Sequence, residues 1–517
     1  MNISENFKLT AGIRFEMPKY PSLDNNFNAA FNKLEFADGV HYSTDQLPSS
    51  RISVSPRVGF NWDITGERKY VLRGGTGIFV GRLPFVWLVS TVGNSGVGQT
   101  TTFYNNLEEA KNRGINQPNY HNSVKDILSD LYPNGFDPKD PAVPSTPTII
   151  DKDLKMPSTW KTSLALDVKL PGDIDFTLEG IYNRDINPAV VTDKSYKEPT
   201  ETIELSRYDI RKKYGEKWNP NSVYLIENAG NKAYYYSISA QLAKQFSCGL
   251  NMSFAYTHSH AKSYTEGLGD QVTSSYKTGT YSVNGINDHE LGYGSYVAPD
   301  RIIATIGYRK EYGKHFASAI SLIYDGSQIG YSGSWSYTRY SYTFDKNVIG
   351  DGYGANSLIY IPASREELND WNFTASTYKE NGKSVEYSAD AQRNDFWAFI
   401  NQDSYLKKHK GEYAKRGGGI MPWRHQFDVK FMQDFYVKVG GKRNTLQFGV
   451  DIENVGNLLN HKWGLYKQLN STSILNYSNG AYHFNTNNGE RLTSSFRNYQ
   501  SFNSTYSVQF SLRYIFN

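Results

Sequence analysis

Cysteine is nearly absent from the sequence, since the 517 residues contain only Cys248. A single thiol excludes an intrachain disulfide and a zinc site built on paired thiolates, and we expect Cys248 to be a small buried or wall-facing residue. Long apolar runs are absent as well. No stretch approaches the ~20 consecutive apolar residues of a membrane-spanning helix, and the mean hydropathy is -0.59. The sequence therefore excludes a helical membrane protein, although not every membrane protein.

An excess of charge of one sign is also missing. Lys and Arg total 55 and Asp and Glu total 51, which gives a formal net charge of +4. This near balance argues against a nucleic-acid-binding protein that neutralises phosphates. The first residues, MNISENFKLT, contain no basic stretch followed by an apolar one, so no secretory signal is visible. Either the protein stays inside the cell or the sequence begins within a longer one.

Aromatic residues and glycine, in contrast, are abundant. The sequence has 40 Tyr, 27 Phe, 9 Trp and 44 Gly, although only 38% of it is hydrophobic. This composition is typical of short alternating strands with girdles of aromatic side chains. A wall with lipid on one side and water on the other must alternate with period two, so periodicity is the test of this interpretation.

The alternation is clearest in residues 422–433, PWRHQFDVKFMQ. One face carries Trp423, His425, Phe427, Val429 and Phe431, and the other carries Arg424, Gln426, Asp428, Lys430 and Met432. Twelve segments share the pattern, and they lie at residues 7–15, 52–62, 70–79, 160–170, 174–182, 234–244, 250–258, 301–309, 316–324, 422–433, 446–454 and 506–516. Their length is close to the ~9 to 11 residues of a tilted membrane strand. The segment 70–79 is the weakest, because Gly74, Gly75 and Gly77 interrupt it.

Short and long connections alternate along the chain. The short ones, which we interpret as hairpin turns, are residues 63–69, 171–173, 245–249, 310–315 and 434–445. The long polar ones are residues 16–51, 80–158, 183–233, 259–299, 335–421 and 466–504. Loops of this length are uncommon in soluble domains, whereas an outer-membrane barrel has tight periplasmic turns and long extracellular loops. The pattern therefore predicts an all-β, antiparallel transmembrane barrel.

Two of the long loops contain helical patterns. Val124, Ile127, Leu128 and Leu131 form a helical stripe that Pro133 ends. Phe396, Phe399, Ile400 and Leu406 form another, which stops at Gly411. We expect both helices to pack within the extracellular loops rather than to bind a ligand directly.

Several segments resemble the barrel region of TonB-dependent outer-membrane receptors, in particular the Oar-like branch typical of Bacteroidota. These segments are residues 55–63 (SPRVGFNWD), 72–87 (LRGGTGIFVGRLPFVW), 158–172 (STWKTSLALDVKLPG), 356–362 (NSLIYIP), 422–435 (PWRHQFDVKFMQDF), 451–464 (DIENVGNLLNHKWG) and 507–516 (SVQFSLRYIF). The resemblance covers nearly the whole chain in the same order. The family commonly ends on an aromatic residue, whereas here Asn517 follows Phe516.

The resemblance implies a barrel of ~22 strands with a plugged lumen, of which residues 1–517 would supply the C-terminal twelve. The plug, the TonB box and a signal peptide would lie upstream of Met1, so the family's coupling residues cannot be assigned to positions here. Half a barrel has two unpaired edges that a bilayer cannot satisfy. We therefore expect segments 7–15 and 506–516 to pair with strands outside this chain and not with each other.

Candidate catalytic and metal sites are weak. His258 and His260 at the mouth of one strand, with Asp288 and His289 in the next loop, are the nearest approach to a rim active site, but no spacing motif supplies a nucleophile. Oxygen ligands for calcium could come from two pairs of carboxylates, Asp151 with Asp153 and Asp137 with Asp140. Neither pair has the alternating ligands and central glycine of a calcium loop, so we interpret them as solvated turn carboxylates. We predict no enzyme activity and no cofactor.

Two further motifs have structural interpretations. The glycines of residues 74–77 (GGTG) lie inside a strand pattern, where they allow a bend or a close approach by the plug and do not form a phosphate cradle. Residues 335–344 (WSYTRYSYTF) either stack on a sugar or peptide, or continue a tall strand above the membrane, and we favour the structural alternative.

Charged and polar residues of both signs are expected on the inner face of the wall. They are Lys8, Arg14, Arg57, Arg73, Lys161, Asp167, Lys169, Asp175, Glu179, Gln426, Asp428, Lys430, Asp451 and Glu453. A lumen lined in this way is wet or plugged, and charge alone does not select one ionic class of substrate.

Three hypotheses for function follow. The first is the C-terminal part of a TonB-dependent receptor in a Gram-negative outer membrane, which captures an unidentified ligand with its loops and imports it through a gated lumen. Its partners would be outer-membrane lipid, the N-terminal barrel and plug part, and through that part the TonB complex, but no nucleic acid. The second is a non-transporting surface or adhesion barrel. The third is a complete twelve-stranded barrel that acts as a small passive pore.

Overall fold

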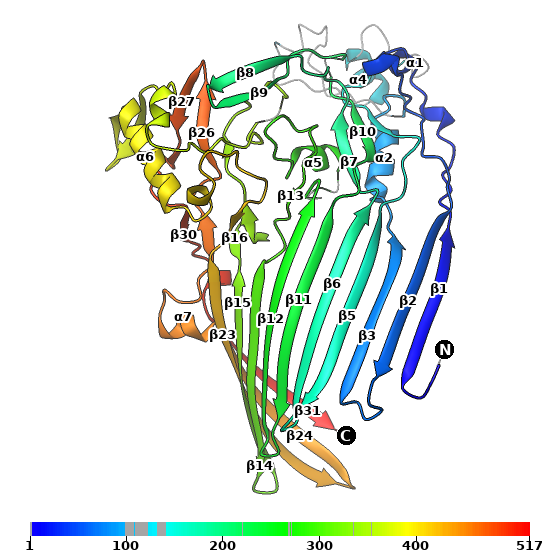
Figure 1. Ribbon diagram of the computed structural model, residues 1–517, viewed down its shortest axis with the longest axis vertical. Helices are drawn as coiled ribbons and strands as arrows, with labels where there is room; N and C mark the ends of the chain where they lie inside the picture. The colour runs from blue at the N-terminus through cyan, green and yellow to red at the C-terminus, as the bar shows by residue number, and fades with distance from the viewer. Residues whose placement is uncertain are drawn as a thin grey trace.

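A long antiparallel sheet dominates the computed structural model (Figure 1). The structure describes residues 3–98, 108, 123–131, 141–219, 221–266, 269, 271–333, 335–352 and 354–516. The sheet curves, and a crown of folded loops lies above one end of it while tight turns lie at the other. We call these ends the crown end and the turn end. In the described part of the chain, no helix is long and apolar enough to cross a membrane.

All twelve expected segments are strands of this sheet, and neighbours in the sequence are neighbours in space. In order across the sheet they are β1 (Phe7–Glu16), β2 (Ser53–Asp63), β3 (Tyr70–Val80), β5 (Ser158–Leu170), β6 (Ile174–Ile186), β11 (Tyr234–Gln245), β12 (Leu250–Ser263), β14 (Asp300–Tyr312), β15 (Phe316–Gln328), β23 (Trp423–Val439), β24 (Lys442–Glu453) and β31 (Ser507–Phe516). A two-residue strand, β13 (Gly292–Tyr293), adds to β12. The fold class is confirmed.

The sheet is open between its first and last strands. Within the described residues, β1 has a ladder with β2 alone and β31 has a ladder with β24 alone. The path from β1 to β31 is otherwise unbroken (Figure 1). The closed twelve-stranded wall that a small pore requires is therefore not formed in this structure.

The register gives the wall one apolar and one polar face. Phe427 pairs with Tyr324 on one face, whereas the next residue, Asp428, pairs with Ile323 on the other. The apolar face is uncovered, since the side chain of Leu164 is 52% exposed and that of Phe510 is 68% exposed. A continuous band of exposed apolar side chains is stable against hydrocarbon and not against water. This face is the lipid face, and the opposite one is the inner face.

The turn between β23 and β24 is tighter than expected. We predicted a glycine-rich link over residues 434–445, but β23 continues to Val439 and β24 begins at Lys442. The turn therefore consists of Gly440 and Gly441, whose φ angles of 60° and 80° suit glycine. Cys248 lies exposed in the turn between β11 and β12, so the expectation of a buried or wall-facing thiol was wrong.

The long loops fold into short strands and helices of their own. The short strands are β4 (Thr148–Ile150), β7 (Ala189–Asp193), β8 (Glu201–Ser206), β9 (Asp209–Lys213), β10 (Tyr224–Asn228), β16 (Gly330–Ser332), β17 (Trp335–Tyr337), β18 (Arg339–Tyr340), β19 (Thr343–Phe344), β20 (Ser376–Glu380), β21 (Lys383–Tyr387), β22 (Gly419–Ile420), β25 (Lys467–Leu469), β26 (Ser473–Ser478), β27 (Ala481–Phe484), β28 (Thr486–Asn487), β29 (Glu490–Arg491) and β30 (Phe496–Asn498). The α-helices are α1 (Ala29–Asn32), α2 (Phe85–Gly93), α4 (Val124–Leu131), α5 (Val272–Lys277), α6 (Ala389–Gln402) and α7 (Val455–Leu459). Their apolar side chains form the main hydrophobic core of the molecule, because the wall itself has little core.

The two helices expected in the loops are present, with different surroundings. In α6, Phe396, Phe399 and Ile400 are buried among aromatic residues of the crown, which confirms the packing role. The helix ends at Gln402, so its expected continuation to Gly411 was wrong; Leu406 is buried in a separate 3-10 turn, Leu406–Lys408. In α4, Val124 is 72% exposed and Leu128 is 45% exposed, so the expected packing of this stripe is not seen against the described residues.

Candidate binding site on the inner wall

The inner face of the first strands carries a row of residues in which glycine alternates with cations. The register aligns Gly12 with Arg57, Arg57 with Gly77, and Gly77 with Lys161. A Cβ atom at Gly77 would lie 2.9 Å from Cγ of Arg57, so only glycine leaves room for the arginine stem. Gly77 was predicted to permit a bend or an approach by a plug, and the neighbour that approaches it in this structure is Arg57.

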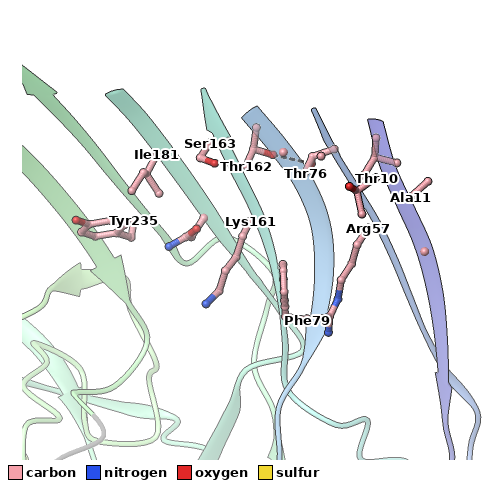
Figure 2. Close-up of a pocket in the computed structure, with 15 residues that line it drawn as sticks. Thr10, Ala11, Arg57, Thr76, Phe79, Lys161, Thr162, Ser163, Ile181 and Tyr235 are labelled. Carbon is pink, nitrogen blue, oxygen red and sulfur yellow. Dashed lines mark hydrogen bonds between the residues drawn. The ribbon is translucent and has the colours of Figure 1, made fainter. Parts of the chain in front are cut away.

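Phe79 lies two residues further along β3 and therefore faces the same side of the sheet as Gly77. Figure 2 shows the Phe79 ring between the side chains of Arg57 and Lys161. The Arg57 guanidinium carbon lies 4.3 Å from the ring centroid and the Lys161 Nζ lies 5.5 Å from it. Both distances are within the range of a cation–π contact. One phenyl ring therefore holds two positive charges at the inner surface.

A hollow of about 730 Å³ opens beside these residues. It exists because the inward positions Gly12, Gly59 and Gly75, on three adjacent strands, have no side chains. Its other inward-facing residues are Thr10, Ser163, Ile181, Asn183 and Tyr235, with Arg57, Lys161 and Phe79 (Figure 2). The volume lies in the range of small-molecule sites, ~300 to 1,000 Å³.

Elsewhere on the inner face, oppositely charged residues form ion pairs. Arg73 binds Asp167 at 2.9 Å and Glu179 at 3.6 Å. Further pairs are Arg14 with Glu16, Lys169 with Asp175, Arg301 with Asp325, and Lys430 with Asp451. Many of the interspersed charges predicted from the sequence are thus arranged as neutral pairs. Arg57 and Lys161, which both line the hollow, form no ion pair with a described residue.

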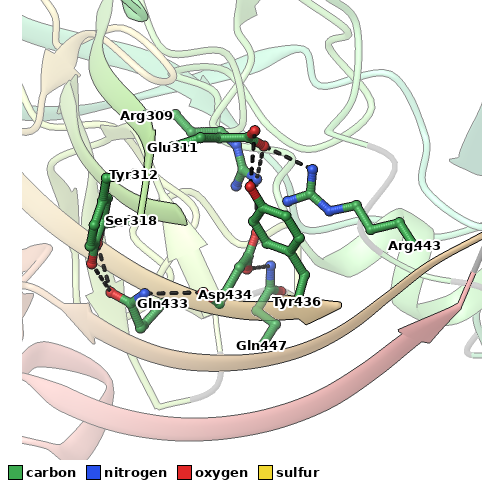
Figure 3. Close-up of polar contacts among 9 residues, drawn as sticks. All are labelled: Arg309, Glu311, Tyr312, Ser318, Gln433, Asp434, Tyr436, Arg443 and Gln447. Atoms are coloured by element: carbon green, nitrogen blue, oxygen red, sulfur yellow. Dashed lines mark hydrogen bonds and ion pairs between the residues drawn. The ribbon is translucent and has the colours of Figure 1, made fainter. Parts of the chain in front are cut away.

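The densest of these networks joins side chains of three strands, β14, β23 and β24, near the turn end (Figure 3). Arg309 binds Asp434 at 2.8 Å, and Gln447 donates to the same carboxylate at 2.8 Å. Arg443 binds Glu311 at 2.8 Å and lies 3.6 Å above the ring of Tyr436. Because every charged group in this network has a partner, it stabilises the wall and offers no free site.

The histidines considered as rim catalysts have structural contacts. His258 is hydrogen-bonded to Asp300 at 2.9 Å, and Tyr256 donates to the same carboxylate at 2.6 Å. The ring of His260 contacts those of Tyr234 and Tyr236, with centroid distances of 5.6 and 5.4 Å. Among the described residues, no serine, threonine or cysteine side chain shares a hydrogen bond with either histidine. The structure does not assemble a catalytic triad here.

Among the described residues, no hydrogen bond, ion pair or ring contact joins Asp288 or His289 to His258 or His260. The two ring nitrogens of His289 are buried without a hydrogen-bond partner among the described residues. Burial lowers the pKa of His289 to about 4. A neutral, enclosed imidazole of this kind is a packing element, and its protonation is unfavourable.

The candidate metal ligands are also accounted for. Asp151 accepts a hydrogen bond from the backbone N–H of Asp153 at 2.9 Å, and Asp153 forms an ion pair with Arg51 at 2.6 Å. These are turn carboxylates, as interpreted from the sequence. Asp137 and Asp140 lie outside the described residues. In the part of the chain that the structure describes, no group of three or more His, Cys, Asp or Glu side chains could hold a metal ion.

Residues 335–344 do not continue a tall strand. They form the short strands β17, β18 and β19, and Tyr340, Tyr342 and Phe344 are buried. The hydroxyl groups of Tyr340 and Tyr342 donate to Asp403 at 3.1 and 2.8 Å. This aromatic segment is thus part of the crown core, and the side chain at its start, Trp335, is 71% exposed.

A strongly two-faced antiparallel wall of this kind defines an outer-membrane β-barrel protein. A family model described as "Outer membrane beta barrel domain" matches residues 2–500, so the chain belongs to this family and is a protein of the Gram-negative outer membrane. No curated protein matches the chain.

Solved structures of outer-membrane receptors and transporters are similar at low identity. The outer membrane transporter YddB from Escherichia coli is 10% identical with a TM-score of 0.36, over 90% of this chain and 41% of that one. The siderophore receptor PirA from Acinetobacter baumannii is 10% identical with a TM-score of 0.36, over 88% and 40%. A variant of the ferric enterobactin receptor PfeA from Pseudomonas aeruginosa is 10% identical with a TM-score of 0.35, over 88% and 46%. The chain thus spans less than half of the length of each of these proteins.

Proposed function

We propose that the chain forms the C-terminal part of the barrel of a TonB-dependent uptake receptor of the Oar-like branch. In this proposal the crown captures a ligand outside the cell, and the ligand passes along the inner face. The remaining strands, the plug and the segment that contacts TonB come from residues outside this chain. The chain performs no chemistry on the ligand and uses no cofactor.

The observation that carries the proposal is the combination of a polar inner face with a hollow of about 730 Å³ below a separately folded crown. A crown with its own core holds loop side chains in fixed positions, as ligand capture requires. A hollow on the inner face gives a ligand a place in the lumen beyond the crown. The segments that resemble TonB-dependent receptors, quoted above, support the same function.

The test is a growth comparison in the bacterium that encodes the chain. Wild type, a strain lacking the chain and a strain lacking TonB are each grown with limiting ferric siderophores, cobalamin, oligosaccharides or peptides. We expect the two deletion strains to fail on the same nutrient, and the defect to be rescued by the full gene. Equal growth of all three strains on every nutrient would contradict uptake.

The second candidate is a surface or adhesion barrel. The observation that favours it is the large folded crown, since a folded surface of this kind can bind other surfaces. Attachment of the same strains to immobilised polysaccharide and protein matrices separates the two functions. Loss of attachment without a growth defect supports adhesion, whereas a growth defect that depends on TonB supports uptake.

A further inference from the structure

We propose that Arg57 and Lys161, on either side of Phe79, form a binding site on the inner wall for a small organic anion with two acidic groups. The inference deepens the proposed function and rests on it, because a ligand reaches the inner face by way of the lumen. It names the chemical class that this part of the lumen accepts.

The first argument is that neither of the two cations has a carboxylate partner among the described residues. The cations of the ion pairs described above have a carboxylate within 3.6 Å. Arg57 and Lys161 form no ion pair with any described residue, and their contacts are with the ring of Phe79. A phenyl ring attracts a cation without neutralising it. Both groups therefore keep their hydrogen-bond donors available for an acidic ligand.

The second argument is that none of the nearby carboxylates lines the hollow. Asp185 lies close enough for the positive charge of Lys161 to act on it, but it accepts a hydrogen bond from Thr159 at 3.3 Å and does not line the hollow. The carboxylates of Asp167 and Glu179 are held by Arg73. No carboxylate lines the hollow, so its charge is positive. Neutral donors are provided by Ser163, Asn183 and Tyr235.

The third argument fixes the number of acidic groups. Arg57 and Lys161 lie on opposite sides of Gly77 in one row of the sheet, and Phe79 separates their ends (Figure 2). One carboxylate can contact one of them closely, whereas two carboxylates joined by a short linker contact both. The linker then passes over the Phe79 ring, where an apolar chain is favourable. A guanidinium suits bidentate binding of a carboxylate, and an ammonium suits a single oxygen.

A small anion fits this site better than an acidic polypeptide. The hollow of about 730 Å³ has the volume of a site for a molecule of drug size or less. Among the residues that line it, Arg57 and Lys161 are the only charged ones, so the positive charge is confined to two points rather than extended along a groove as a polyanionic chain would need.

The experiment measures binding to protein purified, with the polypeptides that accompany it, from the outer membrane of the encoding bacterium. Three probes of equal length are compared by equilibrium dialysis: adipate with two carboxylates, hexanoate with one, and adipamide with none. We expect saturable binding of adipate that weakens with added salt. Because an exposed ion pair contributes up to about fivefold in affinity, hexanoate should bind about fivefold more weakly. Adipamide should not bind measurably.

The variants are chosen so that charge, and not stability, is tested. R57Q/K161Q should weaken adipate binding by at least about tenfold, and K161Q alone by about fivefold. R57K/K161R keeps both charges and should retain binding. The matched control K8Q/K438Q removes two other inward-facing positive charges that do not line the hollow, and it should bind as wild type.

The outcomes are distinct. Adipate binding that is unaffected in R57Q/K161Q, or the absence of saturable adipate binding, overturns the inference. Binding of hexa-glutamate peptide but not adipate assigns the site to an acidic polypeptide and also overturns it. Failure of the TonB-dependent growth test together with normal adipate binding would contradict uptake alone, whereas normal uptake without adipate binding would contradict this site alone.

Discussion

At the scale of single residues, the absence of a side chain at Gly77 leaves room for the side chain of Arg57. Arg57 and Lys161 flank this glycine in the same row, and both reach the ring of Phe79. Most other charged residues of the inner face do not create a binding site, because adjacent carboxylates neutralise cations such as Arg73 and Arg309. Which charges are free follows from contacts between strands and not from the composition.

His289 provides a prediction about acid. Burial lowers its pKa to about 4, whereas an unperturbed histidine has a pKa of ~6.5. Between these values the unfolded crown binds the proton and the folded crown does not, so the stability of the crown should fall as the pH falls from about 6.5 to about 4. His289→Phe removes no hydrogen bond and should flatten this dependence, measured as the rate of proteolysis of the crown on intact cells.

Asp351 serves as a control, because its ionisation should change the stability of the crown with pH in the opposite direction. Burial raises its pKa to about 6, above the ~3.9 of an unperturbed aspartate. The folded crown then binds more protons between these values, so this group adds stability as the pH falls from about 6 to about 4. Asp351→Asn should therefore steepen the acid loss, and an unchanged slope in both variants would contradict the assignment.

The two faces of the wall give a second prediction at this scale. Phe427→Arg and Leu164→Arg place a charge in the lipid, which should cost ~2 to 4 kcal/mol near the bilayer midplane. Their neighbours Gln426 and Ser163 face the lumen, so the same change there should cost far less. The measurement is the urea concentration at which the heat-modifiable form is lost in lipid vesicles. Equal losses on both faces would indicate a soluble sheet covered on both sides.

At the scale of elements, different interactions stabilise the crown and the wall. Strands of the wall are fixed by backbone ladders and by lipid, whereas α6 is fixed by burial of Phe396, Phe399 and Ile400 in an aromatic core. The helix begins at a serine cap, since the Ser388 hydroxyl accepts a hydrogen bond from the N–H of Ala391 at 3.3 Å.

Phe396→Ala tests this division. Removal of a fully buried phenylalanine typically costs ~3 to 5 kcal/mol, so we expect faster external proteolysis of the crown, while heat-modifiability of the wall is retained. Trp335→Ala, at a crown side chain that is 71% exposed, should leave both properties unchanged. Simultaneous loss of the wall and the crown in Phe396→Ala would show that the two fold as one unit.

The first and last strands give a prediction about edges. The backbone groups on the outer edges of β1 and β31 need partners in hydrocarbon, and the proposal supplies these from outside the chain. In a background with Cys248→Ser, Ala11→Cys and Leu512→Cys should not form a disulfide in native membranes. Ala11→Cys with Val58→Cys, at paired positions of β1 and β2, is the positive control. A disulfide between positions 11 and 512 would instead support a closed twelve-stranded pore.

At the scale of the whole molecule, the wall separates a crown of folded loops from a set of tight turns (Figure 1). If the crown is extracellular, trypsin added to intact cells should cut at the exposed hairpin between β20 and β21, next to Lys383. The turns over residues 63–69 and 310–315 should stay intact until the outer membrane is permeabilised. Cleavage in these turns on intact cells would reverse the orientation.

The sequence by itself determined the wall. Strand positions could be predicted because lipid and water impose an alternation of period two that each segment must satisfy locally, as in residues 422–433. A second local rule, the 3.6-residue period of a helix, predicted α6 from the spacing of Phe396, Phe399 and Ile400.

Only the tertiary structure decided which side chains form the inner hollow and the crown core. Residues 57, 79 and 161 are far apart in the sequence, and they meet because the register of three strands aligns them across Gly77. Residues 335–344 have the alternation of a strand, yet they are divided into short pieces because burial of Tyr342 and Phe344 against other loops stabilises them more than a longer ladder. Such contacts depend on non-local packing, which no local period encodes.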